Sequence, residues 1–299
     1  MSSSEHIPES EQQQARFAKA VNRQGYAFQN ALLRQCVGLN ESRKSSWSFE
    51  AAEFPVEVNG DGTRIDFVLW ADQRPYWLLA ECKRVNPALA DWLFLRTSYV
   101  RRYARTEQII AEQVAKDASG CCSADGVEIW NPHPHFVGHR GFEVRTEKEG
   151  ESGSSRDAIE EAAGQVLRGL NGMVNHLTRQ PTALGPGRRR ILLPVIFTTA
   201  NLWVSDADLS NSDVRTGRID PKALNPLKVS YLFYQYHLSP GIKHGVGPSS
   251  IIREPFAGGL SLVLARSFIR TVAIVCADGV EDFLTQLPVD RFIPSDIQC

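Results

Sequence analysis

The pattern of hydrophobic and polar positions in the first sixty residues predicts a helical segment followed by a strand. Residues 12–37 repeat apolar side chains at helical spacing, and the interruption at Gly25 fits either one helix or two. Trp47–Val58 alternates between apolar and polar side chains, as a strand does, and Pro55 predicts an edge position or a bulge. The run Asn59-Gly60-Asp61-Gly62 then indicates a turn.

Two short apolar runs after this turn predict a β-hairpin. They are Arg64–Trp70 and Tyr76–Val85, and the link between them, Ala71–Pro75, has the polar residues and proline of a hairpin turn. Both runs lack regular polar alternation, so we expect both faces of these strands to be covered.

Three charged residues interrupt the hairpin where charge is costly. Asp66 lies on the first strand, and Glu81 and Lys83 lie two residues apart on the second, so both project to the same side. Strand pairing can bring Asp66 beside Glu81. Buried charge needs a partner or a metal ion, and two carboxylates suit Mg²⁺. A purely structural ion pair of Lys83 with a carboxylate is the alternative interpretation.

At these residues the chain resembles the PD-(D/E)XK nuclease superfamily, in which an acidic residue on one strand precedes Glu-x-Lys on the next. Here the motif reads Ile65-Asp66 and Glu81-Cys82-Lys83, with fourteen residues between the two acids. The resemblance implies an α/β, restriction-endonuclease-like fold with a mixed central sheet flanked by helices. It also implies that Asp66, Glu81 and the carbonyl of Cys82 bind Mg²⁺ (or Mn²⁺), and that Lys83 positions the attacking water.

The resemblance extends to two glutamines. Many members have a glutamate on the helix before the first strand, and the matching position here is Gln29. Glutamine binds water but is a poor Mg²⁺ ligand, which puts a second metal ion in doubt. Some members place a glutamine on a later helix, and Gln165 fits that position. Ordinary polar helix surface is the alternative for both.

The segment from Arg84 to Pro87 ends the strand, and the run from Ala88 to about Ala118 has few helix breakers and predicts a long helix with aromatic residues between its basic ones. That combination suits contact with phosphates and stacking on bases, although a solvated helix face remains the alternative. The candidate nucleic-acid contacts are Arg96, Tyr99, Arg101, Arg102, Tyr103 and Arg105.

The remaining pattern predicts one nuclease-like domain over residues 12–299, after a disordered tail at residues 1–11. Its core covers about residues 12–200 and contains an insertion at about 119–157. A helix follows from Asp157 to about Arg179, and the apolar run at 191–204 predicts a strand pair or one bent strand. The β-rich residues 201–299 are expected to add strands to the same sheet, and their role is left open.

Composition narrows the function classes. The net charge of −1 excludes a globally basic nucleic-acid binder but permits a local basic patch. Without an apolar run of about 18 residues we expect no membrane span, and the first residues lack a secretory pattern, which favours the cytoplasm. Six cysteines in 299 residues form no disulfide scaffold. Cys121 and Cys122, with His133, His135 and His139, leave a zinc site as a weaker alternative.

The sequence thus favours a Mg²⁺-dependent nuclease that hydrolyses phosphodiester bonds, with DNA preferred to RNA and a restriction or anti-phage role on family precedent. A homodimer is one option for its assembly. The main alternative is a catalytically inactive module on the same fold that binds nucleic acid or a protein. A third interpretation makes the charged cluster structural, in an unrelated α/β enzyme whose site lies near the histidines.

Overall fold

The structure is a computed structural model of the whole chain. It describes residues 9–23, 25–58, 60–71, 75–96, 109–129, 135–144, 158–180, 184, 188–207, 209–237 and 269–287.

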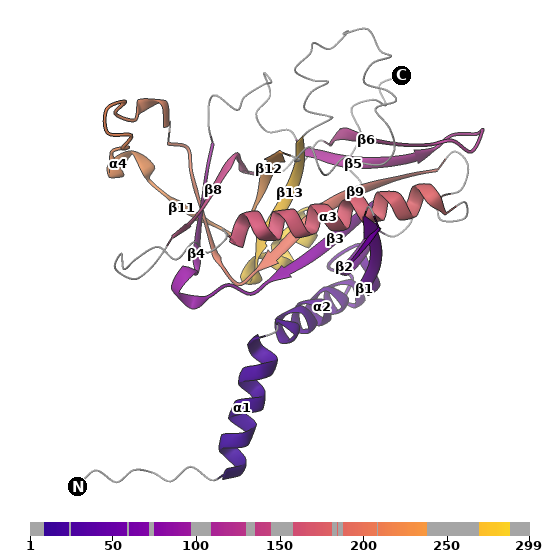
Figure 1. Cartoon of the computed structure of the whole chain (residues 1–299), viewed down its shortest axis with the longest axis horizontal. Helices are drawn as coiled ribbons and strands as arrows, with labels where there is room; N and C mark the ends of the chain where they lie inside the picture. The colour runs from indigo at the N-terminus through magenta and orange to yellow at the C-terminus, as the bar shows by residue number, and fades with distance from the viewer. Residues whose placement is uncertain are drawn as a thin grey trace.

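A nine-stranded mixed sheet forms the centre of the molecule (Figure 1). Seven strands follow one path across it, in the order β1 (Trp47–Val58), β2 (Asp61–Ala71), β3 (Tyr76–Lys83), β9 (Arg189–Thr198), β13 (Ile269–Cys276), β12 (Tyr231–His237) and β7 (Val137–Gly138). The other two, β5 (Ile109–Lys116) and β6 (Cys122–Ile129), pair with each other, and β5 also pairs with the first half of β9. β9 is parallel to both β3 and β13, whereas β1, β2 and β3 are antiparallel.

Helices cover both faces of this sheet, as the alternation along β3 shows. Leu79 packs into the core beneath α3 (Ala158–Arg179), whereas Leu78 and Ala80 pack on the side of α2 (Tyr26–Glu41) and α6 (Val280–Gln286). The coarse prediction of a mixed α/β fold with a central sheet and flanking helices is therefore confirmed. No helix in the described ranges has both the length and the apolar character needed to cross a bilayer.

The N-terminal predictions are also confirmed, with small shifts of the boundaries. The helical stretch is divided into α1 (Glu9–Arg23) and α2. Gly25, which precedes α2, has a φ of 77°, in the left-handed region that favours glycine. Strand β1 lies at the sheet edge, a position that tolerates a proline such as Pro55, and its register shifts between Phe49 and Ala51.

The prediction of a long helix over residues 88–118 is wrong for the residues that the structure describes there. A 3₁₀ helix at Pro87–Leu89 leads into strand β4 (Asp91–Leu95), and Ile109–Lys116 forms β5. The residues Ala, Glu, Gln and Lys favour helices by propensity, but Ile109, Ile110, Ala111 and Glu112 are all buried. A strand covered on both faces by its neighbours outweighs that local preference.

A second, four-stranded sheet corrects the prediction for residues 201–299. Its order is β11 (Leu227–Val229), β10 (Asn201–Ser205), β4 and β8 (Arg140–Val144). Among the described strands of the C-terminal part, β12 and β13 join the large sheet, whereas β10 and β11 lie in the second one. The chain changes sheets at Thr199 and Ala200, between β9 and β10, so the apolar run at 191–204 is neither a strand pair nor one bent strand.

A buried ion pair joins β5 to β13 and leads to a prediction about stability. Glu112 and Arg270 are 0% and 2% exposed, and Arg270 Nε donates a hydrogen bond to Glu112 Oε2. We expect Arg270→Met to lower the free energy of unfolding by about 3–5 kcal/mol, because it leaves a carboxylate buried without its cation. The double variant Arg270→Met with Glu112→Leu should recover most of this loss. Urea denaturation of both variants would check it, and equal losses would contradict the explanation.

Candidate functional site

The charged hairpin is built around the point at which β2 and β3 separate. Their pairing runs from Trp70 opposite Trp77 to Phe67 opposite Ala80, and it ends there. Continuing this register places Asp66 opposite Glu81. The backbone N–H of Cys82 instead donates to Oδ2 of Asp66, at 2.7 Å. A side-chain carboxylate thus occupies the gap between the strands, and we call this place the strand fork.

The alternation of side chains along β2 changes at Asp66. Ile65 packs in the core on the α3 side, but Phe67, only two residues later, packs on the α2 side. In a regular strand these two residues would share a face. The irregularity leaves the Asp66 side chain close to the plane of the sheet, where it reaches β3.

Both carboxylates at the strand fork have raised pKa values. Burial raises the pKa of Glu81 to about 8, and the negative charge of Asp66 adds to this, while Lys83 counteracts it. Burial is also the largest cause that raises the pKa of Asp66, opposed by the hydrogen bond from the Cys82 N–H. When two carboxyl groups lie close together in a partly buried site, both are ionised at once only if a positive charge, such as a cation, lies beside them.

Helix α3 supplies polar side chains to the same side of the sheet. Nζ of Lys83 lies 3.3 Å from Oε2 of Glu161, and Arg168 lies close enough to Glu81 to lower its pKa. Glu161, Gln165 and Arg168 have the spacing of one helix face, so Gln165 lies between the two charged residues. Its Oε1 atom is buried and has no hydrogen-bond partner in the described part of the chain.

Gln29 closes the strand fork from the α2 side. Its side chain is 8% exposed, and its Nε2 donates to Oε1 of Glu53, at 2.7 Å, and to the backbone carbonyl of Asp66, at 3.1 Å. The second bond satisfies a carbonyl next to the point where β2 and β3 stop pairing. Gln29 therefore holds the backbone of the site, and these two bonds do not reach the carboxylates of Asp66 or Glu81.

Glu53 is a third acid in line with the other two. The β1–β2 register pairs Ala52 with Phe67 and Phe54 with Ile65, which places Glu53 opposite Asp66. Glu53 has a φ of 50°, a left-handed conformation that is unusual for a residue with a side chain. Its negative charge contributes to the raised pKa of Asp66.

The sequence interpretation missed Glu53, Glu161 and Arg168. Glu161 and Arg168 had a usable signal, because they lie one helical turn on either side of Gln165. Glu53 had no such signal in the sequence. It is one of three glutamates on a strand in which polar and apolar residues alternate.

Most of the candidate nucleic-acid contacts, namely Tyr99, Arg101, Arg102, Tyr103 and Arg105, lie outside the described residues. Arg96 is described, but it follows strand β4 and not a helix. Its guanidinium lies 3.1 Å from Asp206 and stacks 4.5 Å from the ring centre of Phe136. Arg96 thus already has an acidic and an aromatic partner within the chain.

The residues of the zinc alternative are not brought together where they are described. Cys121 and Cys122 lie at the turn between β5 and β6, the ring of His135 contacts Phe233, and His139 is buried before β8. His133 lies outside the described residues. Among those that the structure does describe, no three His, Cys, Asp or Glu side chains are grouped as metal ligands.

Comparisons of this chain with protein-family models, with curated proteins and with solved structures found no match. The interpretation of the strand fork depends on its geometry and on the motif that its residues form.

Proposed function

We propose that this chain is a divalent-metal-dependent nuclease of the PD-(D/E)XK type, which hydrolyses phosphodiester bonds, with DNA preferred to RNA. One observation carries the proposal. The carboxylates of Asp66 and Glu81 meet where β2 and β3 separate, and Lys83 lies on the same strand as Glu81 and pairs with Glu161 of α3. A structural ion pair would need only one carboxylate for the lysine.

The order of elements supports a restriction-endonuclease-like core. Helix α2 and the antiparallel strands β1 to β3 are consecutive, and after the intervening strands β4 to β8 come helix α3 and strand β9, which returns to pair with β3. The two helices cover opposite faces of this part of the sheet (Figure 1). The strand fork lies toward the end of β3, between them. A restriction or anti-phage role remains a proposal on family precedent.

The residues at the strand fork fit a bound Mg²⁺ or Mn²⁺. Mg²⁺ is usually held by one or two carboxylates together with a substrate phosphate, which matches Asp66 and Glu81. The raised pKa of Glu81, to about 8, marks an excess of buried negative charge that a cation would offset. The buried Oε1 of Gln165 is a further oxygen without a hydrogen-bond partner among the described residues. The carbonyl of Cys82 completes the proposed ligand set.

When bound, the metal ion would polarise the scissile phosphate and lower the pKa of a water molecule. The chain's own residues would do the positioning. Lys83, held by Glu161 on α3, would orient the attacking water and stabilise negative charge that develops on the phosphate. Attack on phosphorus would break the bond to the 3′ oxygen and leave a 5′-phosphate end.

A cleavage assay tests this proposal. Plasmid DNA, linear duplex, single-stranded DNA and RNA would each be incubated with the protein and Mg²⁺, Mn²⁺ or excess EDTA. We expect cleavage that requires the metal and produces 5′-phosphate ends, which ligation or end-labelling after phosphatase treatment reveals. Equal products with EDTA, or no cleavage of any of these substrates, would count against the proposal.

The alternative function, an inactive binding module on the same fold, is favoured by the contacts of Gln29. The amide of Gln29 is held by Glu53 and the Asp66 carbonyl, so α2 brings no carboxylate to the strand fork at this position. Such a module would bind nucleic acid with an affinity unchanged by Asp66→Asn. A nuclease would instead bind in the presence of Ca²⁺ and lose part of that affinity in the variant.

A further inference from the structure

The second sheet has a face that points away from the core of the molecule. Trp92 and Phe94 of β4, like their neighbours on β10, pack in the core beneath α3. Because side chains alternate along a strand, Leu93 of β4 and Trp203 of β10 lie on the opposite face. Strand pairing places Phe142 of β8 opposite Leu93, and Leu93 opposite Trp203. These three residues form a row across the sheet, which we call the outer row.

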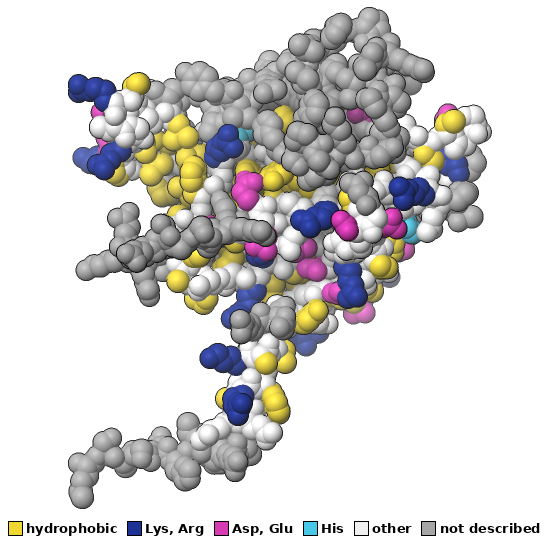
Figure 2. Space-filling view, viewed as in Figure 1, with side chains coloured by type: hydrophobic (Ala, Val, Ile, Leu, Met, Phe, Trp, Pro, Cys, Tyr) yellow, Lys and Arg dark blue, Asp and Glu magenta, His cyan; other side chains and the backbone are white. Residues whose placement is uncertain are grey.

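The outer row is open to the outside and lies apart from the hydrophobic core. Phe142 is 44% exposed, Val144 on the same strand is 40% exposed, and Leu93 and Trp203 are half-buried. None of these four side chains belongs to a hydrophobic cluster in the described part of the chain. Figure 2 shows hydrophobic side chains gathered between the second sheet and α4 (Pro221–Leu224), with lysine and arginine side chains around them. A surface with two large aromatic rings suits a flat ligand.

Trp203 is held in a fixed orientation by Asp91. The indole Nε1 of Trp203 donates to Oδ1 of Asp91, at 2.8 Å, and the side-chain amide of Asn201 donates to the same oxygen, at 3.1 Å. Asp91 pairs with Asn201, which precedes Trp203 by two residues on β10. The ring therefore leans along β10 over the sheet, and its one polar group is already bonded. A ligand meets the apolar face of this ring, as in stacking.

Positive charge lies at one end of the outer row. Ser205, two residues after Trp203 and on the same face, donates a hydrogen bond to the carbonyl of Leu224, so the segment 209–224 reaches this end. The segment has three exposed basic side chains, and none of them forms an ion pair with an acid in the described ranges, namely Arg215, Arg218 and Lys222. Its acids, Asp213 and Asp220, accept backbone N–H groups within the segment. Cations beside aromatic rings are the combination that binds an unpaired nucleic-acid strand.

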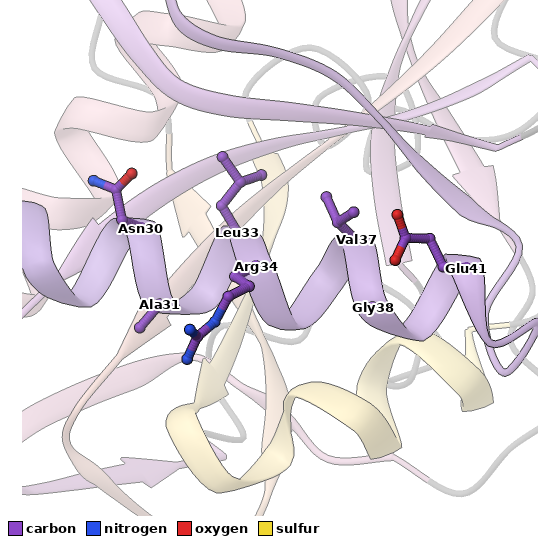
Figure 3. Close-up of a pocket in the computed structure, with 7 residues that line it drawn as sticks. All are labelled: Asn30, Ala31, Leu33, Arg34, Val37, Gly38 and Glu41. Carbon is purple, nitrogen blue, oxygen red and sulfur yellow. The ribbon is translucent and has the colours of Figure 1, made fainter.

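The hollow along the outer surface of α2 lacks this combination (Figure 3). It has a volume of about 820 Å³ and is lined by Asn30, Ala31, Leu33, Arg34, Val37, Gly38 and Glu41. Its guanidinium, from Arg34, is accompanied by the carboxylate of Glu41, and no aromatic ring is among its lining residues. A nucleic-acid strand therefore fits the outer row better than this hollow.

The size of the face favours a strand of nucleic acid over a folded protein. β4, β8 and β10 have five residues each, so the outer face of the four-stranded sheet covers roughly 300 Å². A stable protein interface buries about 800 Å² on each partner. A four-stranded sheet with exposed aromatic side chains has room for about two or three stacked bases. The face is also close to the strand fork, because Trp203 follows Thr198, the pairing partner of Lys83, by five residues, or at most about 18 Å.

We propose that the outer row binds an unpaired strand of nucleic acid, with bases stacked on Trp203 and Phe142 and phosphates beside the basic side chains of the segment 209–224. This binding site is separate from the strand fork and does not require the chain to be a nuclease. With the proposed function, the outer row would keep a single-stranded part of the substrate within reach of Lys83. The substrate would then have an unpaired end or flap beside the cleavage point.

Fluorescence anisotropy with a short, labelled oligo(dT) tests the site, in EDTA to prevent cleavage. We expect the full chain to bind this probe, and Phe142→Ala and Trp203→Ala each to raise the Kd by about 10-fold or more, since each removes a ring on which a base stacks. Phe49→Ala is the matched control, because it removes a phenylalanine of similar exposure, 41%, from β1. It should bind as the wild type does. Thermal melting would show that each variant remains folded.

Two further measurements show how the probe binds. Tryptophan emission should fall when oligo(dT) binds, and most of this decrease should be lost in Trp203→Phe, which keeps a ring for stacking and most of the affinity. A blunt duplex should compete much less well than unlabelled oligo(dT), because its bases are not free to stack on the outer row.

Three results would overturn the proposal: no binding of oligo(dT) by the wild type, equal affinities of Phe142→Ala, Trp203→Ala and Phe49→Ala, or equal competition by the duplex. These results are separable from cleavage. A chain that binds oligo(dT) through the outer row but cleaves nothing would keep this site and lose the nuclease function. A chain that cleaves DNA but does not bind oligo(dT) would do the reverse.

Discussion

Replacing Lys83 by methionine is expected to lower the rate of metal-dependent DNA cleavage by roughly 10²- to 10³-fold. Methionine keeps the length of the side chain but removes the charge that pairs with Glu161 at 3.3 Å and lies beside Glu81. Asp66→Asn should have an effect at least as large. It keeps the shape that receives the Cys82 N–H and removes one of the two carboxylates. Single-turnover cleavage of a labelled duplex in Mg²⁺ would measure both.

The matched control for this experiment is Lys228→Met, which removes the same charge from an exposed position on β11 of the second sheet. It should cleave at the wild-type rate. If Lys83→Met and Lys228→Met cleave equally well while both remain folded, the strand fork is not the catalytic centre. A preserved rate in Asp66→Asn would lead to the same conclusion.

Replacing Glu81 by glutamine is expected to stabilise the metal-free protein at alkaline pH. Burial and the charge of Asp66 raise the pKa of Glu81 from the usual 4.5 to about 8, so the folded chain holds this proton more tightly than the unfolded chain. The stability due to this group is complete below about pH 4.5 and is lost as the pH rises through 8. Glutamine does not ionise, so the advantage of the variant should grow over this range, to roughly 5 kcal/mol at pH 9, since each pKa unit of the shift is worth about 1.4 kcal/mol.

Thermal melts from pH 5 to pH 9 without divalent metal would check this expectation, with Glu50→Gln, an exposed acid on β1, as the control. Added Mg²⁺ at pH 8 should raise the melting temperature of the wild type by several degrees and leave Glu81→Gln nearly unchanged. If the melting temperatures of the wild type and Glu81→Gln changed in parallel with pH, the raised pKa of Glu81 would not be the cause of the expected difference. A metal-dependent shift in Glu81→Gln equal to that of the wild type would remove Glu81 from the proposed ligands.

The local sequence pattern predicted the structure of the hairpin because its interactions join residues that are close together in the chain. The link Ala71–Pro75 forces the two runs to pair as neighbours, and pairing in that register places Asp66 opposite Glu81. The two-residue period of a strand places Lys83 on the side of Glu81. Gly25 divides the helical stretch into α1 and α2 because its backbone is left-handed, a conformation that glycine adopts more readily than other residues.

Other parts of the site depend on contacts between distant segments. Glu161 meets Lys83 from 78 residues further along the chain, because α3 packs across the sheet. Helical spacing showed which residues share a face with Gln165, but not what that face covers. Glu53 reaches Gln29 through an unusual backbone conformation within β1, which no residue pattern announces.

The sequence by itself determined the charged hairpin, the helices around it and the motif that suggests a nuclease, since each depends on neighbours within a few residues. Only the tertiary structure decided that Ile109–Lys116 is a strand, because its burial between β6 and β9 outweighs its helical propensity. It also decided that β10 leaves the large sheet to pair with β4. At the strand fork, it placed three acids from three strands in one line, with a lysine that an acid from α3 holds in place.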